Sequence, residues 1–148
     1  MITQRNRTRA GKGRLQQLRR PRRGSEILEA ALVFPILLAL AFGTVEFGYY
    51  FYVEHNLESA AREGARAGIV DGTNEDINNA VNEVMKHSGY AVGDYDPPEI
   101  GLSGDQNEYL TVKVKMHWSN VSEGLKPMHM IQPQNDVVVG TATMRIEK

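Results

Sequence analysis

The chain of 148 residues contains no cysteine. This absence excludes a disulfide scaffold, a thiolate metal site, a cysteine nucleophile and a thiol redox centre. The phosphate-binding, dinucleotide-binding, zinc-protease and serine-hydrolase motifs are also missing from the sequence. We therefore expect a protein that is not an enzyme, that has no cofactor and that acts on no small-molecule substrate.

Acidic residues are missing from the first 24 positions, which carry nine basic residues. The other 124 residues hold 8 basic and 18 acidic side chains, a formal charge of −10. The net charge of −1 is therefore the sum of a basic N-terminal segment and an acidic remainder. A basic run of this kind can bind nucleic acid or anionic lipid. Its position directly before an apolar segment favours a signal for membrane orientation, and we expect no nucleic-acid partner.

Charged residues are also missing from positions 30–45, and after Glu46 the sequence stays apolar to Val53. A helix over 27–53 would be about 40 Å long, which exceeds a hydrocarbon core of about 30 Å. Tyr49, Tyr50 and Tyr52 would suit the membrane surface, and the positive-inside rule places residues 1–24 in the cytoplasm. We expect a single-pass protein of the inner membrane that spans it to about residue 53, with its C-terminal part outside.

Two other interpretations of the apolar block remain open at this point. One is a plain membrane anchor without further function. The other is a secretory signal cleaved at Ala39-Leu40-Ala41, although the sequence stays hydrophobic beyond that site, where a mature secreted protein normally begins polar.

Glu29 lies near the start of the apolar block, where a carboxylate is costly unless it is paired or neutralised. The null hypothesis is an acid favoured by the dipole of the first helical turn. A cut after Gly24 would make Ser25 the first residue and Glu29 the fifth, an arrangement that resembles the type IV prepilin signal. That resemblance implies a prepilin peptidase that removes residues 1–24. The new amine of Ser25, with an ordinary pKa of about 7.7–8.0, could then be paired with Glu29.

Three further segments are Leu-Val-Phe-Pro-Ile-Leu-Leu at 32–38, Phe-Gly-Thr-Val-Glu-Phe-Gly at 42–48 and Ala-Ala-Arg-Glu-Gly-Ala-Arg-Ala-Gly at 60–68. In this order and spacing they resemble the TadE-like family, the minor pseudopilins of the tight-adherence (Tad, Flp) pilus system. The resemblance implies a structural pilus component whose partners are the prepilin peptidase, other pilus subunits and minor pilins, and whose location can extend to the extracellular pilus. We assign assembly to Glu29 and Glu46. The alternative is an unprocessed, single-pass anchored domain that binds an envelope partner.

The periodicity predicts an α+β fold: a long pilin-like helix over 25–70, transmembrane in its first half, and a small head over 71–148. A capped helix after Thr73 carries an apolar stripe from Ile77 to Met85. Strands are expected at 99–102, 110–118 and 137–146, in one antiparallel sheet packed on a helix. Gly64 and Gly68 would permit close approach of a neighbouring segment.

The head contains two sets of residues that could suggest a metal site. Asp94, Asp96 and Asp105 could bind calcium, but they lack EF-hand spacing. His129 lies between Met128 and Met130, a pattern that could suggest copper, yet a loop histidine and two packing methionines fit it better. We expect no metal site.

Overall fold

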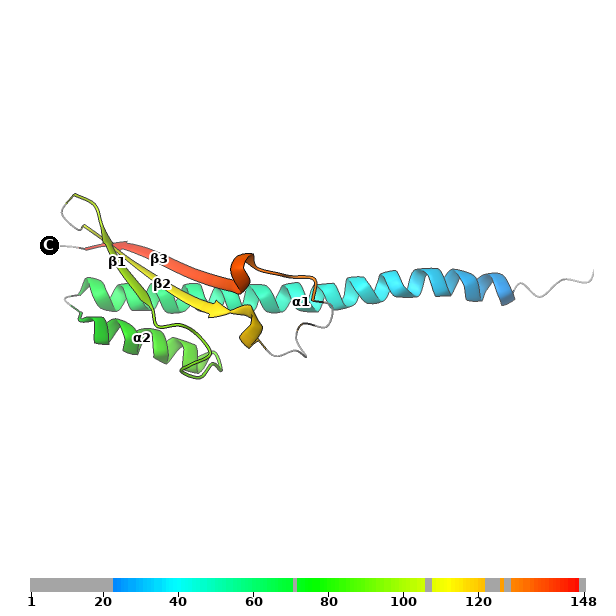
Figure 1. Cartoon of the computed structure of the whole chain (residues 1–148), viewed down its shortest axis with the longest axis horizontal. Helices are drawn as coiled ribbons and strands as arrows, with labels where there is room; N and C mark the ends of the chain where they lie inside the picture. The colour runs from blue at the N-terminus through cyan, green and yellow to red at the C-terminus, as the bar shows by residue number, and fades with distance from the viewer. Residues whose placement is uncertain (1–22, 71, 106–107, 122–125, 127–128, 147–148) are drawn as a thin grey trace, which may run out of the picture. The chain divides into compact units, whose positions relative to one another are not determined.

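The computed structural model describes residues 23–70, 72–105, 108–121, 126 and 129–146. It contains a long apolar helix followed by a small head with a second helix and a three-stranded antiparallel sheet (Figure 1). The predicted α+β fold is therefore confirmed. The basic leader over residues 1–22 lies outside the described residues.

Helix α1 runs from Arg23 to Ile69 and includes Pro35. Because proline has no N–H, one carbonyl in the preceding turn loses its helical hydrogen bond there. The chain divides after Pro35 into two compact units. The first unit contributes the start of α1 to the described residues, and the second holds the rest of α1 together with the head.

Helix α2, Asn74–His87, begins with a complete capping box. The Thr73 backbone N–H and hydroxyl donate to Oδ2 of Asp76 over 2.8 and 2.7 Å, and the Asp76 N–H donates back to Thr73 Oγ1 over 3.3 Å. The two bonds from Thr73 lower the pKa of Asp76, the backbone bond having the larger effect. The cap that the sequence predicted at Thr73 is confirmed.

This lowered pKa predicts a stability difference that depends on pH. The charged carboxylate stabilises the folded state above its unfolded pKa of about 3.9, and the contribution is lost as the pH falls through the lower folded pKa. Asp76→Asn should therefore lower the urea midpoint of the detergent-solubilised protein at neutral pH, and the difference in midpoint between variant and wild type should disappear in acid. A difference in midpoint that stays constant as the pH is lowered would contradict this role of the carboxylate.

The sheet has the order β1-β2-β3, with strands Glu99–Ser103, Tyr109–His117 and Val137–Arg145, all antiparallel. Val112 of β2 lies opposite Ile100 of β1 and Ala142 of β3. Buried and solvent-facing residues alternate along β2, as the sequence pattern predicted. Short 3₁₀ turns follow β2 at Trp118–Asn120 and precede β3 at Gln134–Asp136.

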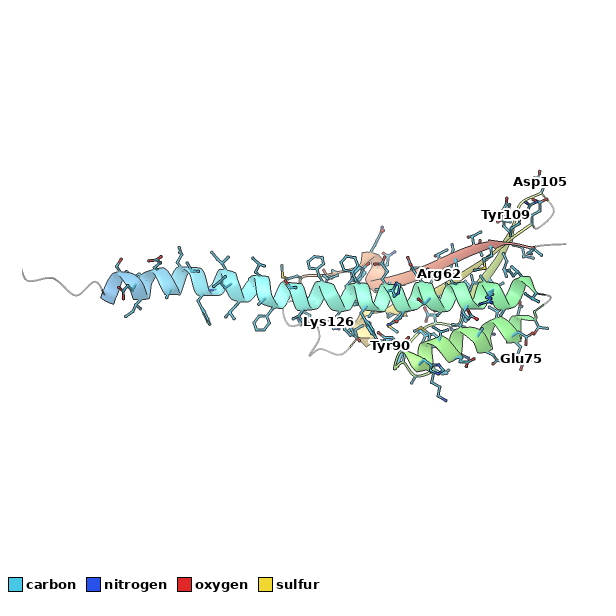
Figure 2. All side chains as sticks on the ribbon, turned by 180° about the vertical axis from the view of Figure 1, so that it is seen from behind. Arg62, Glu75, Tyr90, Asp105, Tyr109 and Lys126 are labelled. Atoms are coloured by element: carbon cyan, nitrogen blue, oxygen red, sulfur yellow. The ribbon has the colours of Figure 1, made fainter. Side chains whose placement is uncertain are left out.

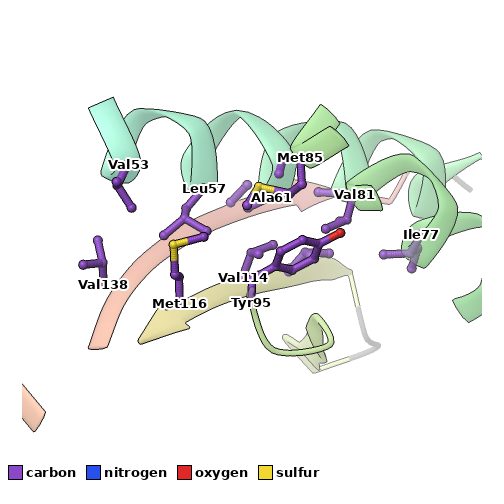
Figure 3. Packing of buried hydrophobic residues seen from close by; sticks show 14 of the residues in the cluster. Val53, Leu57, Ala61, Ile77, Val81, Met85, Tyr95, Val114, Met116 and Val138 are labelled. Carbon is purple, nitrogen blue, oxygen red and sulfur yellow. The ribbon is translucent and has the colours of Figure 1, made fainter. Parts of the chain in front are cut away.

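The core lies where α2 and the inner face of the sheet meet the C-terminal half of α1 (Figure 3). Side chains of α1, α2, β2 and β3 interdigitate there, and most of them are fully buried; they include Val53, Leu57 and Ala61 of α1, Val81 and Met85 of α2, Val114 and Met116 of β2, and Val138 of β3. The spacing of the α1 members places them on one face of that helix.

Glycines on α1 allow the close approach that the sequence predicted. A Cβ on Gly64 would lie 2.7 Å from Val81 Cγ2, and one on Gly68 would lie 2.8 Å from Ile77 Cδ1 and would also overlap Leu110. Both positions therefore face neighbouring side chains of the head.

Candidate functional site

The largest exposed apolar surface lies on the N-terminal part of α1. From Gly24 to Phe42 every residue is exposed except the half-buried Ala39. Large side chains are involved, for example Leu32 at 71% exposed and Phe34 at 61% (Figure 2). Soluble monomers rarely expose contiguous apolar surface of this extent. By length and composition, α1 can cross a membrane.

The residues predicted for processing and assembly lie at the start of this surface. Gly24, Ser25 and Glu29 are all exposed in the first turns of α1. Ser25 and Glu29 are four positions apart, so they lie on one face of the helix. A Cβ added at Gly24 would meet no atom within 4 Å, so folding does not require glycine there.

Glu46 has a different environment from Glu29. Its side chain is fully buried, and Oε1 accepts a hydrogen bond of 2.9 Å from the backbone N–H of Ile131. The structure therefore includes Glu46 in the head fold. Glu46 and Glu29 are 17 positions apart in the sequence of α1.

Aromatic residues fix the next turn of α1 to the head. The rings of Tyr50 and Trp118 meet edge-on with centroids 5.6 Å apart, and Tyr49 lies 6.4 Å from the same Trp118. The hydroxyls of Tyr49 and Tyr90 are 3.5 Å apart, and the Tyr52 hydroxyl donates to the Ser88 carbonyl over 3.2 Å. Burial, followed by the bond with Tyr49, raises the pKa of Tyr90. Tyr49 and Tyr50, which the sequence placed at the membrane surface, are thus partly covered by the head.

Residues 129–131 lie against the neighbouring part of α1. Met130 packs over Gly43, where an added Cβ would lie 3.5 Å from the methionine sulfur, yet Met130 remains 56% exposed. Lys126 is buried, and its Nζ donates to the Trp118 carbonyl over 3.2 Å. Sequence periodicity gave no sign of these contacts, since residues 120–134 carry no apolar repeat.

The acidic residues weighed as calcium ligands are spread over the head. Asp94 accepts a hydrogen bond of 2.7 Å from the Ala91 N–H. Oδ2 of Asp96 lies 3.7 Å from Nε2 of His117. Asp105 is exposed beyond the end of β1. Among the described residues, no three histidine or acidic side chains come together as a cation site. Met128, named in the copper hypothesis, lies outside the described residues.

Comparison with known protein families gives a match in the N-terminal half of the chain. The sequence model of the TadE-like protein family matches residues 24–66, which begin at Gly24 and include the whole exposed apolar stretch. Neither the curated proteins nor the solved structures contain a match to the chain.

Proposed function

From the match of the TadE-like family model to residues 24–66, we propose that the protein is a minor pseudopilin, a structural component in the assembly of a tight-adherence pilus. The observation that carries the proposal is that the family match covers the exposed apolar part of α1. Its partners would be the prepilin peptidase, other pilus subunits and the inner membrane.

The membrane-spanning part of α1 would be shorter than the sequence pattern indicated. From Ser25, the first residue after the proposed cleavage, to exposed Phe42 the helix has 18 residues, about 27 Å of helix, close to a hydrocarbon thickness of about 30 Å. Buried positions begin at Gly43 and include Glu46 and Val53. We therefore place the outer end of the span near Glu46 rather than near Val53.

The orientation follows from the distribution of basic residues. Nine of them precede the apolar block, whereas Arg62 is the first beyond it, so the N-terminus would be cytoplasmic and the head outside. A reporter that is active only outside the inner membrane should be active when fused after Lys148. A stable fusion without activity would contradict this orientation.

Cleavage after Gly24 would leave Ser25 with a free, cationic amine at the edge of the membrane. An isolated charge in that low-dielectric setting is costly. The carboxylate of Glu29 would neutralise the amine, in its own helix or in that of a neighbouring subunit. The exposure of Glu29 supports this role, because a partner subunit can reach the side chain.

Loss of the protein should abolish or strongly reduce pilus formation. A deletion strain should lack surface pili by electron microscopy, and the wild-type gene supplied in trans should restore them. Normal piliation in the deletion strain would contradict the proposed function and would favour an anchored domain with another envelope partner.

A further inference from the structure

The exposed apolar surface near the outer end of the span is not confined to α1. Met130 is 56% exposed, and Phe42, next to Gly43 on α1, and Phe47, one turn further along, are 41% and 50% exposed. The contact between Met130 and Gly43 makes the methionine continuous with this helical surface. Two segments that are far apart in sequence thus present one apolar patch.

The level of this patch along α1 coincides with the proposed membrane boundary. A span of about 27 Å that starts at Ser25 ends close to Gly43. At that depth a segment without regular structure is tolerated only if its backbone polar groups are satisfied. The Ile131 N–H meets this condition, because it donates to the buried carboxylate of Glu46.

We propose that residues 129–131 enter the boundary between lipid headgroups and acyl chains beside α1, so that the protein contacts the outer leaflet through the head as well as through its helix. The proposal rests on the membrane anchor of the proposed function. Methionine suits this role, because its side chain is apolar and flexible. Exposed His129, with its polar ring, would lie toward the headgroups.

Glu46 acquires a specific role in this arrangement. Its carboxylate holds the backbone of the 129–131 segment against α1, so Met130 is presented at a fixed depth. The acid is shielded from lipid because its side chain is fully buried. Glu46 would therefore act as a positioning residue for the membrane contact.

The absence of cysteine allows a direct test with single-cysteine variants of the full chain. Met130→Cys, Leu37→Cys and Asp105→Cys would each carry an environment-sensitive fluorophore, and the proteins would be reconstituted into phosphatidylcholine vesicles. Leu37 lies in the middle of the apolar block, whereas Asp105 lies at the end of the head away from Lys126 (Figure 2). Lipids with a nitroxide quencher near the headgroup or near the chain end report the depth of each label.

We expect the label at position 130 to lose most of its emission to the headgroup-proximal quencher, and the label at 37 to the quencher near the chain end. The label at 105 should keep its emission with both. If the label at 37 is quenched but the label at 130 keeps its emission like the label at 105, the inference is wrong, whereas the membrane anchor is supported. If 37 is not quenched, the membrane anchor itself fails. Shielding of 130 that rises with the protein-to-lipid ratio would assign the patch to a second copy of the chain and overturn the inference.

Discussion

A strain whose only copy of the protein carries Glu29→Gln should accumulate the protein, cleave it after Gly24 and produce no pili. Glutamine keeps the shape of the side chain and removes its charge, so the amine of Ser25 loses its counter-charge. An unpaired charge at the edge of the bilayer costs several kcal/mol, enough to prevent stable docking of a subunit. Piliation and co-purification with other pilus components would measure the effect.

The chain offers two controls for this variant. Glu26→Gln removes another exposed acid from the first turn of α1, and we expect normal piliation. Glu46→Gln disturbs a buried carboxylate that accepts a backbone hydrogen bond, so any defect should appear in the protease resistance of the head. Wild-type piliation with Glu29→Gln would show that Glu29 is only an acid favoured at the start of a helix and has no role in assembly. Equal loss of pili in all three variants would indicate that the negative charges act collectively.

Gly140→Val should destabilise the head severely. A Cβ at this position of β3 would overlap backbone atoms of Leu57 and Glu58 on α1, and a helix backbone cannot move aside as a flexible side chain can. Strand β3 would have to separate from α1, which would open the packing around Val138. Overpacking typically costs about 1–3 kcal/mol, and we expect at least the upper end of that range. Since domains are stable by only about 5–15 kcal/mol, much of the folding free energy would be lost.

Gly101→Val is the matched control in the same sheet. A Cβ on Gly101 of β1 would meet only the Thr111 carbonyl oxygen, at an ordinary 4.0 Å, and the residue is exposed. Valine also suits a strand better than glycine does. In urea unfolding of the detergent-solubilised protein, Gly101→Val should keep the wild-type midpoint while Gly140→Val lowers it strongly. Equal midpoints for the two variants would show that the contact between Gly140 and α1 is not required.

The elements of the fold could be predicted because each has a local signal. The Thr73 cap marks the start of α2, and alternation marks β2, where buried Val112 and Val114 flank exposed Lys113. The apolar block marks the first half of α1. These patterns depend on residues close together in sequence, so they require no knowledge of tertiary packing.

The boundary between helix and head could not be predicted in this way. Glu46 looked like an interruption in a membrane helix, because the hydrogen bond that explains it comes from Ile131, 85 residues later. The role of Gly140 depends likewise on a contact with Leu57 of α1. Periodicity identifies the face of a helix that becomes buried, but it does not identify the loop or strand that covers it.

The N-terminal residue of the protein extracted from membranes tests the central claim most directly. The account predicts a chain that begins at Ser25, and a Gly24→Val variant that remains a full-length precursor because the side chain obstructs the cleavage site. A wild-type protein that begins at Met1 would contradict processing and leave an unprocessed anchored domain. A protein that begins at Phe42 would identify a secretory signal and remove the membrane helix from the account.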